Sequence, residues 1–127
     1  MFSTPKADIL TNSSGDATVY ISHGPNGNPN GFLVCIRYVP VDLDTGADLT
    51  ITGEDSLIPI MTKTNVGTST VFFYPRALLN AVADGAAATN PSEFIPIKNE
   101  RIKVVVAQGG NAKTGSIEAW LINRPPY

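Results

Sequence analysis

The chain carries one histidine, His23, and one cysteine, Cys35, so few combinations of its side chains can perform nucleophilic catalysis. A Ser or Cys nucleophile needs a base to accept its proton, and histidine usually supplies that base. His23 begins the loop 23–31, which is almost entirely Gly, Asn and Pro and is expected to hold a base poorly. One His and one Cys also cannot form a zinc site. We therefore predict a protein that is not an enzyme and carries no cofactor.

Three aspartates, Asp42, Asp44 and Asp48, lie in a seven-residue turn together with Gly46. Carboxylate oxygens at this density are ligands that Ca²⁺ uses. The spacing departs from the EF-hand loop, which has a third ligand two residues after the second and a distant Glu. Aspartate also favours turns because its side chain bonds to nearby backbone groups. The turn is kept as a calcium candidate beside the alternative of ordinary turn formation, and no other metal site is predicted.

Acidic and aromatic residues are present in the numbers that sugar chemistry needs, but their spacing selects no site. No two carboxylates stand out as an acid and base pair for sugar hydrolysis. The aromatic residues fall mostly at positions that alternate as in strands, where a hydrophobic core explains them.

Arg76, behind Pro75 at the expected exit of a strand, has two interpretations. It anchors a partner through a carboxylate or main-chain carbonyls, or it stabilises a corner within the monomer.

The composition argues against nucleic-acid and membrane partners. The 127 residues have a net charge of −2, and their nine Lys and Arg are spread singly. Because no basic stripe can neutralise phosphates, direct nucleic-acid binding is not expected. The N-terminal residues lack a signal-peptide pattern, and no apolar run approaches the ~20 residues of a membrane helix. We expect synthesis in the cytoplasm and a buried, unreactive Cys35, with an interchain disulfide or a reactive thiol as the alternative.

The elements that must position these residues are predicted to be strands, which recur every ~10 to 15 residues between turn signals. The strand 32–39 is apolar on both faces and is expected to be central. Pro59 places the strand 57–61 at an edge or a bulge. The segment 75–85 is equally open to two helical turns, with Pro75 at the start and Gly85 as a stop, and to an irregular excursion. The remaining expectations are strands at 17–22, 49–52, 69–74 and 94–98, and a loop at 86–91.

The segment 99–122 is predicted to be a β-hairpin, because two alternating runs flank a turn rich in Gly and Asn. In the second run Ile117, Ala119 and Leu121 share one face, and Trp120 and Ile122 share the other. Both faces of this strand are therefore apolar. Such a strand lies between two layers or is covered by a partner subunit.

Together these patterns predict an all-β protein: a single-domain antiparallel β-sandwich, jelly-roll-like, of about seven or eight strands with extended terminal arms. Residues 1–15 are expected to be an N-terminal extended arm, 16–122 the β-sandwich domain and 123–127 a C-terminal tail. The two ends lack core patterns. We expect them to lie on a neighbouring subunit and to pair with its sheet edge.

Several segments share a pattern with one group of proteins. The segments 11–20, 31–38 and 48–54 each combine a turn with a strand, and Tyr74-Pro75-Arg76 follows. The most specific segment is 99–115, Asn-Glu-Arg-Ile-Lys-Val-Val-Val-Ala-Gln-Gly-Gly-Asn-Ala-Lys-Thr-Gly. Over most of residues 11–122 the chain resembles small structural proteins encoded among the head and tail genes of tailed bacteriophages. The long loop 23–30 and the Pro-Pro-Tyr ending depart from that group.

The resemblance implies a non-enzymatic virion protein of the capsid. Its first implied role is that of a decoration or cement protein, which binds and stabilises the major capsid shell as a homo-oligomer, a trimer or dimer. The major capsid protein or neighbouring virion proteins are then its partners. The alternative is a neck or tail adaptor, or a host-surface protein whose loop 23–31 and aspartate turn contact a glycan or an ion. The residues expected to contact partners are Phe2, Pro5, Ile9, Tyr74, Arg76, Pro125 and Tyr127.

Overall fold

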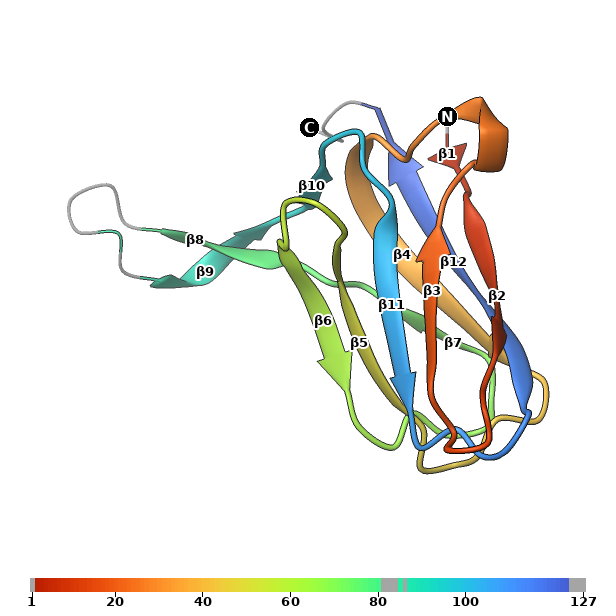
Figure 1. Ribbon diagram of the computed structural model, residues 1–127. Helices are drawn as coiled ribbons and strands as arrows, with labels where there is room; N and C mark the ends of the chain where they lie inside the picture. Colours follow the sequence, from red (N-terminus) through yellow and green to blue (C-terminus); the bar gives the residue numbers. More distant parts are fainter. Residues whose placement is uncertain (1, 81–84, 86, 124–127) are drawn as a thin grey trace.

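The computed structural model describes residues 2–80, 85 and 87–123. These residues form antiparallel strands and one short 3₁₀ turn, η1 (Gly24–Asn26), so the predicted all-β class is confirmed (Figure 1). None of the described residues belongs to a helix long and apolar enough to span a bilayer.

Two sheets pack face to face as a sandwich (Figure 1). The first, sheet A, has β12 and β4 at its centre, and the second, sheet B, has the order β3-β11-β5-β6. Sheet A comprises β1 (Phe2–Ser3), β2 (Lys6–Leu10), β4 (Gly31–Pro40), β7 (Val71–Phe73), β10 (Ile95–Ile97) and β12 (Thr114–Ile122). Sheet B comprises β3 (Ala17–Ile21), β5 (Asp48–Gly53), β6 (Pro59–Lys63) and β11 (Ile102–Ala107).

Strands that follow one another in the chain mostly lie in opposite sheets. The chain crosses the core between β2 and β3, β3 and β4, β4 and β5, β6 and β7, β10 and β11, and β11 and β12. This interleaving is the double-sheet jelly-roll arrangement. The predicted sandwich is therefore confirmed, and β4 is central as expected because it pairs with β12, β10 and β7. The prediction that Pro59 lies in an edge strand is confirmed as well, because Pro59 begins β6, the outermost strand of sheet B.

The hydrophobic core lies between the inner faces of the two sheets. Alternate residues of β5, β11 and β12 are buried there, as the period-two pattern predicts. Removing this apolar area from water is the main stabilising contribution, at roughly 25 cal/mol per Å². The side chains with no exposed surface include Ile21, Leu33, Ile36, Tyr38, Ile51, Ile102, Val104, Val106, Ile117, Ala119 and Leu121.

The prediction of a hairpin over 99–122 is wrong. β11 pairs with β3 and β5 in sheet B, whereas β12 pairs with β1, β2 and β4 in sheet A. The connection between them therefore crosses from one sheet to the other. It is held by Thr11, whose hydroxyl donates to the Gly110 carbonyl at 2.5 Å, and by the Gly109 N–H, which donates to the Gly15 carbonyl at 2.8 Å. Buried faces alternate in the same way in a hairpin and in such a crossing, so the pattern alone does not separate them.

The prediction that residues 1–15 form an arm outside the core is also wrong. Residues Lys6–Leu10 form β2, which pairs with β12 of the same chain. Ile9 is 2% exposed and belongs to the core. Pro5 is buried, and its carbonyl accepts a hydrogen bond from the Ala119 N–H at 2.9 Å. β2 has a single buried residue, Ile9, followed by the exposed Leu10, so its sequence shows no clear alternation of apolar and polar residues.

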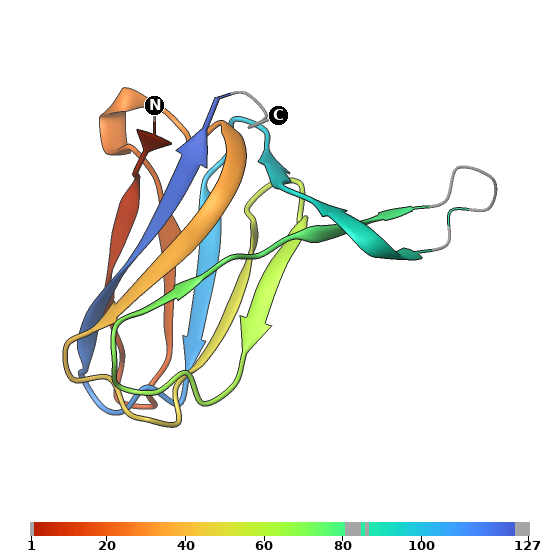
Figure 2. The ribbon, with the colours of Figure 1, turned by 180° about the vertical axis from the view of Figure 1, so that it is seen from behind.

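A two-stranded ribbon replaces the helix or irregular excursion expected at 75–85 and the loop expected at 86–91. It consists of β8 (Ala77–Asn80) and β9 (Ala87–Glu93), which pair with each other, while residues 81–84 and 86 lie outside the described part. The chain leaves sheet A after β7 to form this ribbon and returns to sheet A at β10. Figures 1 and 2 both show the ribbon extending away from the sandwich.

Candidate functional site

The base of the ribbon is fixed by Arg76. Its Nη1 donates to the Val34 carbonyl of β4 at 2.9 Å and to the Pro75 carbonyl at 2.8 Å. Its guanidinium carbon lies 4.0 Å from the ring centroid of Phe94, a cation–π contact across the two chain segments that enter and leave the ribbon. Burial lowers the pKa of Arg76, although arginine stays charged at any physiological pH. Arg76 therefore holds the corner from which the ribbon departs, as the monomer-internal interpretation expected.

The outer face of sheet A carries a row of aromatic side chains. Trp120 of β12 lies between Phe2 of β1 and Phe72 of β7, with ring centroids 5.7 and 5.6 Å apart. We call these three residues the aromatic row. Figure 2 shows this side of sheet A, with β4 in orange and β12 in blue, and no other described element lies over it. Phe2 is 55% exposed and Phe72 is 39% exposed, so the row is an apolar surface open to solvent.

Polar groups beside the aromatic row are paired within the chain. The Trp120 indole Nε1 donates to Glu118 Oε1 at 2.5 Å. The Arg37 guanidinium lies 6.0 Å from the ring centroid of Phe72, and Arg37 is the cross-strand neighbour of both Phe72 and Glu118. The row therefore presents ring faces and edges, with its one indole donor already satisfied.

His23 does have a hydroxyl neighbour, which the sequence did not reveal. The Ser3 Oγ and the His23 Nε2 are 3.1 Å apart, and they join β1 to the turn that follows β3. A nucleophilic serine needs a histidine that a third group orients. No carboxylate contacts His23 among the described residues. The contact ties the N-terminal strand to loop 23–31, and we assign it that positioning role.

The three aspartates of the calcium candidate do not converge on one point. Asp42 Oδ1 accepts a hydrogen bond from the Thr114 N–H at 2.6 Å, which lowers the pKa of Asp42. Asp48 Oδ1 accepts one from the Asn65 N–H at 2.9 Å, and the Asp44 carboxylate lies against Gly110. Across the described residues, no three His, Cys, Asp or Glu side chains gather closely enough to hold a metal. The aspartates instead secure three different loop segments, so ordinary turn formation is the interpretation that fits.

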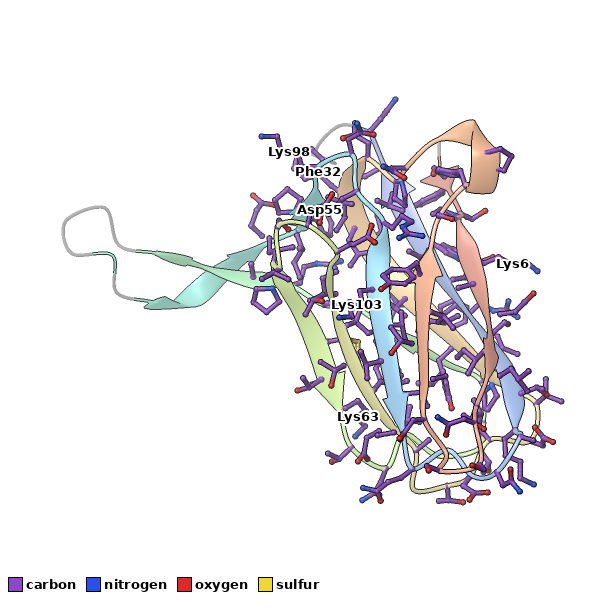
Figure 3. The ribbon with its side chains drawn as sticks, in the orientation of Figure 1. Lys6, Phe32, Asp55, Lys63, Lys98 and Lys103 are labelled. Carbon is purple, nitrogen blue, oxygen red and sulfur yellow. The ribbon has the colours of Figure 1, made fainter. Side chains whose placement is uncertain are left out.

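An open pocket of about 490 Å³ lies at the end of the sandwich near the start of β4 (Figure 3). Phe32, Ile58 and Pro96 supply apolar walls, and Lys98 lies at the rim. The buried Glu100 carboxylate borders it, but its Oε1 accepts hydrogen bonds from the Asp55 and Ser56 N–H groups at 2.8 and 3.0 Å. This oxygen is therefore directed at the turn between β5 and β6.

Cys35 is 2% exposed, which confirms the prediction of a buried residue. Burial raises the pKa of its thiol. Because the thiolate is the reactive form, a raised pKa makes this cysteine a poor nucleophile.

The residues predicted to contact partners are thus divided. Phe2 and Tyr74 are exposed, Arg76 is engaged within the chain, and Pro5 and Ile9 are buried, so the prediction is wrong for the last two. Pro125 and Tyr127 lie outside the described residues. The prediction did not include Trp120 and Phe72, although the apolar residues on both faces of the last strand are the signal that points to the row.

The chain was also compared with known proteins. No protein-family model and no curated protein matches it. The jelly-roll topology, the ribbon and the aromatic row are therefore the features from which a function can be inferred.

Proposed function

We propose that the protein is a non-enzymatic structural component of a tailed-bacteriophage virion, and that it acts as a capsid decoration or cement protein bound to the major capsid shell as a homo-oligomer. The observation that carries the proposal is the β8–β9 ribbon. β8 and β9 pair with each other and make few contacts with the sandwich. An isolated two-stranded hairpin is marginally stable in water, so a ribbon of this kind needs another surface to pack on.

The sandwich supplies the rigid body that such a ribbon requires. Among the described residues the core lies between the two sheets, and Arg76 fixes the angle at which the ribbon leaves. Double-sheet jelly rolls recur in viral capsid and lectin domains, and this analogy of fold supports the proposal. The low net charge is compatible with a protein whose surface is in permanent contact with other proteins in an assembly.

Cementing follows from mass action. A protein that binds neighbouring capsomers in the assembled shell, but not the separated subunits, stabilises the shell by the free energy of that binding. An oligomer engages several sites at a high effective concentration, so modest individual contacts yield tight overall binding. No catalytic group is needed for this role.

The test is a binding experiment with the separated parts of the phage that carries the gene. The purified full chain is incubated with expanded heads and with tails, and each mixture is sedimented. We expect the protein to sediment with heads and to raise the temperature at which the heads release DNA. Sedimentation with tails alone would favour the neck or tail role, binding to host-surface glycans would favour a receptor-binding role, and no binding to either part of the virion contradicts both virion roles.

A further inference from the structure

Two features of the described part of the chain have no other element packed over them and could receive a partner. One is the ribbon, β8 and β9, which has no sheet packed on either side among the described residues. The other is the aromatic row of Phe2, Trp120 and Phe72 on the outer face of sheet A. Contiguous apolar patches that are exposed on a protein surface often mark interaction sites.

The two surfaces cannot meet within one chain. The ribbon leaves from the β7 and β10 side of sheet A and extends away from the sandwich in both views (Figures 1 and 2). Arg76 locks that direction through its hydrogen bonds to two carbonyls and its stacking on Phe94. A ribbon held at this angle can reach the outer face of sheet A only in another copy.

We propose that the ribbon of one copy packs across the aromatic row of a second copy. The inference rests on the homo-oligomer of the proposed function and deepens it by naming the two surfaces that join the copies. The contact is heterologous, because a ribbon meets a face, so it closes either as a reciprocal dimer or as a ring.

The chemistry of the two surfaces is complementary. In the sequence, the two ribbon strands, 77–80 and 87–93, include three alanines, two leucines, one acidic residue and no Lys or Arg. Small side chains let a ribbon approach aromatic rings closely, and the absence of cations avoids repulsion from Arg37 beside Phe72. The Trp120 N–H is already bonded to Glu118, so covering the row buries no unpaired indole donor.

The area of the contact decides which assemblies are stable. A ribbon two strands wide measures ~10 Å across, and the seven-residue β9 spans ~24 Å, so one contact buries roughly 500 Å² counted over both partners. A specific interface needs at least ~1,000 Å². One ribbon on one face falls short of this, whereas a reciprocal dimer doubles the contact and a closed ring gives every copy two contacts. Loss of either surface should therefore release monomers rather than a weaker oligomer.

The test removes each surface separately from the full chain. Phe72→Lys places a charge in the row, with Phe2→Lys as a second row variant at the more exposed position. In the ribbon variant, residues 78–92 are replaced by Asn-Gly, which closes the hairpin because Ala77 and Glu93 are register partners. Val41→Lys is the matched control, since Val41 is 75% exposed and lies in neither surface. Thermal unfolding verifies that each variant is folded, and sedimentation velocity gives its mass.

We expect the wild type and Val41→Lys to sediment as the same dimer or trimer, and the row variants to sediment at the monomer mass of 13.5 kDa. The ribbon variant should sediment at its own, smaller monomer mass, because it is thirteen residues shorter. A photoreactive phenylalanine analogue at position 72 should crosslink to a peptide from 77–93 of another copy. A ribbon variant that keeps the wild-type number of copies would overturn the inference in favour of packing between two rows. A monomeric wild type, with or without glycan binding at the row, would overturn it as well.

The outcome is separable from that of the proposed function. If wild-type protein binds heads but its mass is insensitive to both surfaces, the inference fails and the virion role stands. If both surfaces control the mass but nothing binds heads, the inference stands and the virion role fails.

Discussion

Glu100 offers a sharp test of how this sandwich is held together, because one oxygen of its carboxylate organises a whole turn. The residue is 3% exposed. Its Oε1 accepts hydrogen bonds from the backbone N–H groups of Asp55 at 2.8 Å and Ser56 at 3.0 Å, in the turn that joins β5 to β6. The turn packs directly on the carboxylate, since a Cβ added to Gly53 would lie 2.7 Å from the same oxygen.

Two substitutions separate the charge of Glu100 from its hydrogen bonds. Glu100→Gln can keep an oxygen in the same place, so both bonds survive without charge assistance, and at ~1 kcal/mol lost per bond the cost is about 2 kcal/mol. Glu100→Ala leaves two N–H groups without an acceptor, each costing ~1–3 kcal/mol. Because the adjoining pocket admits water, we expect the lower half of that range, about 2–4 kcal/mol in total, with Ala more costly than Gln.

The pH dependence of this contribution has a definite sign. Burial alone would raise the pKa of Glu100, but the hydrogen bonds from Ser56 and Asp55 outweigh it, so the pKa is lowered on folding. A lowered pKa gives stability that is present above the unfolded pKa, ~4.3, and is lost as the pH falls through the folded pKa. The difference between wild type and Glu100→Gln should therefore be largest near pH 7 and should shrink below about pH 4.

Urea unfolding at pH 7 and at pH 3.5 measures both quantities, and Glu54→Gln is the control. The Glu54 carboxylate pairs with Arg101 at the surface, where screening weakens ion pairs, so its loss should cost less than that of Glu100. A Gln variant as unstable as the Ala variant, or a difference from wild type that grows in acid, would refute the assignment of the turn to the charged oxygen.

Two further substitutions probe the core and the backbone. The Tyr38 hydroxyl is buried without a hydrogen-bond partner among the described residues, and burial raises the pKa of Tyr38 to about 12. Tyr38→Phe should stabilise the protein by about 1 kcal/mol in urea unfolding at pH 7. The wild type should lose stability as the pH rises from ~10 to about 12, and the variant should not. A variant less stable than the wild type would show that the hydroxyl has a partner. Gly31 has a φ of 131°, and a Cβ there would overlap the Ile122 carbonyl oxygen, so Gly31→Ala should cost at least ~2 kcal/mol; an unchanged urea midpoint would contradict this.

The alternation of apolar residues predicted the strands and their buried faces well, and the pairing of those strands poorly. Val104 and Ile117 are both fully buried, as the period-two pattern of β11 and β12 requires. That pattern states which face of a strand meets the core, but not which neighbour supplies its hydrogen bonds. The eight residues from Gln108 to Gly115 are long enough to cross between sheets, so loop length left the hairpin and the crossing equally open.

The ribbon was missed for a different reason. The segment 77–93 is rich in Ala and Leu, which favour helices, and Pro75 and Gly85 resemble a helix start and stop. The structure pairs β8 with β9 instead. The helix propensity of individual residues predicts secondary structure poorly in a segment whose conformation is determined by packing against another surface.

The separation of the ribbon from the core has a physical consequence for assembly. Tyr38 faces the core and Glu100 faces the turn between β5 and β6, and neither belongs to the ribbon or the aromatic row. Substitutions there should therefore change the unfolding free energy without changing the mass of the oligomer. Substitution of Phe72 or removal of the ribbon should do the reverse. Arg76 is the exception, because its hydrogen bond to the Val34 carbonyl and its stacking on Phe94 tie the ribbon to β4. Stability and assembly are thus coupled at this corner, and a change of Arg76 is expected to disturb both together.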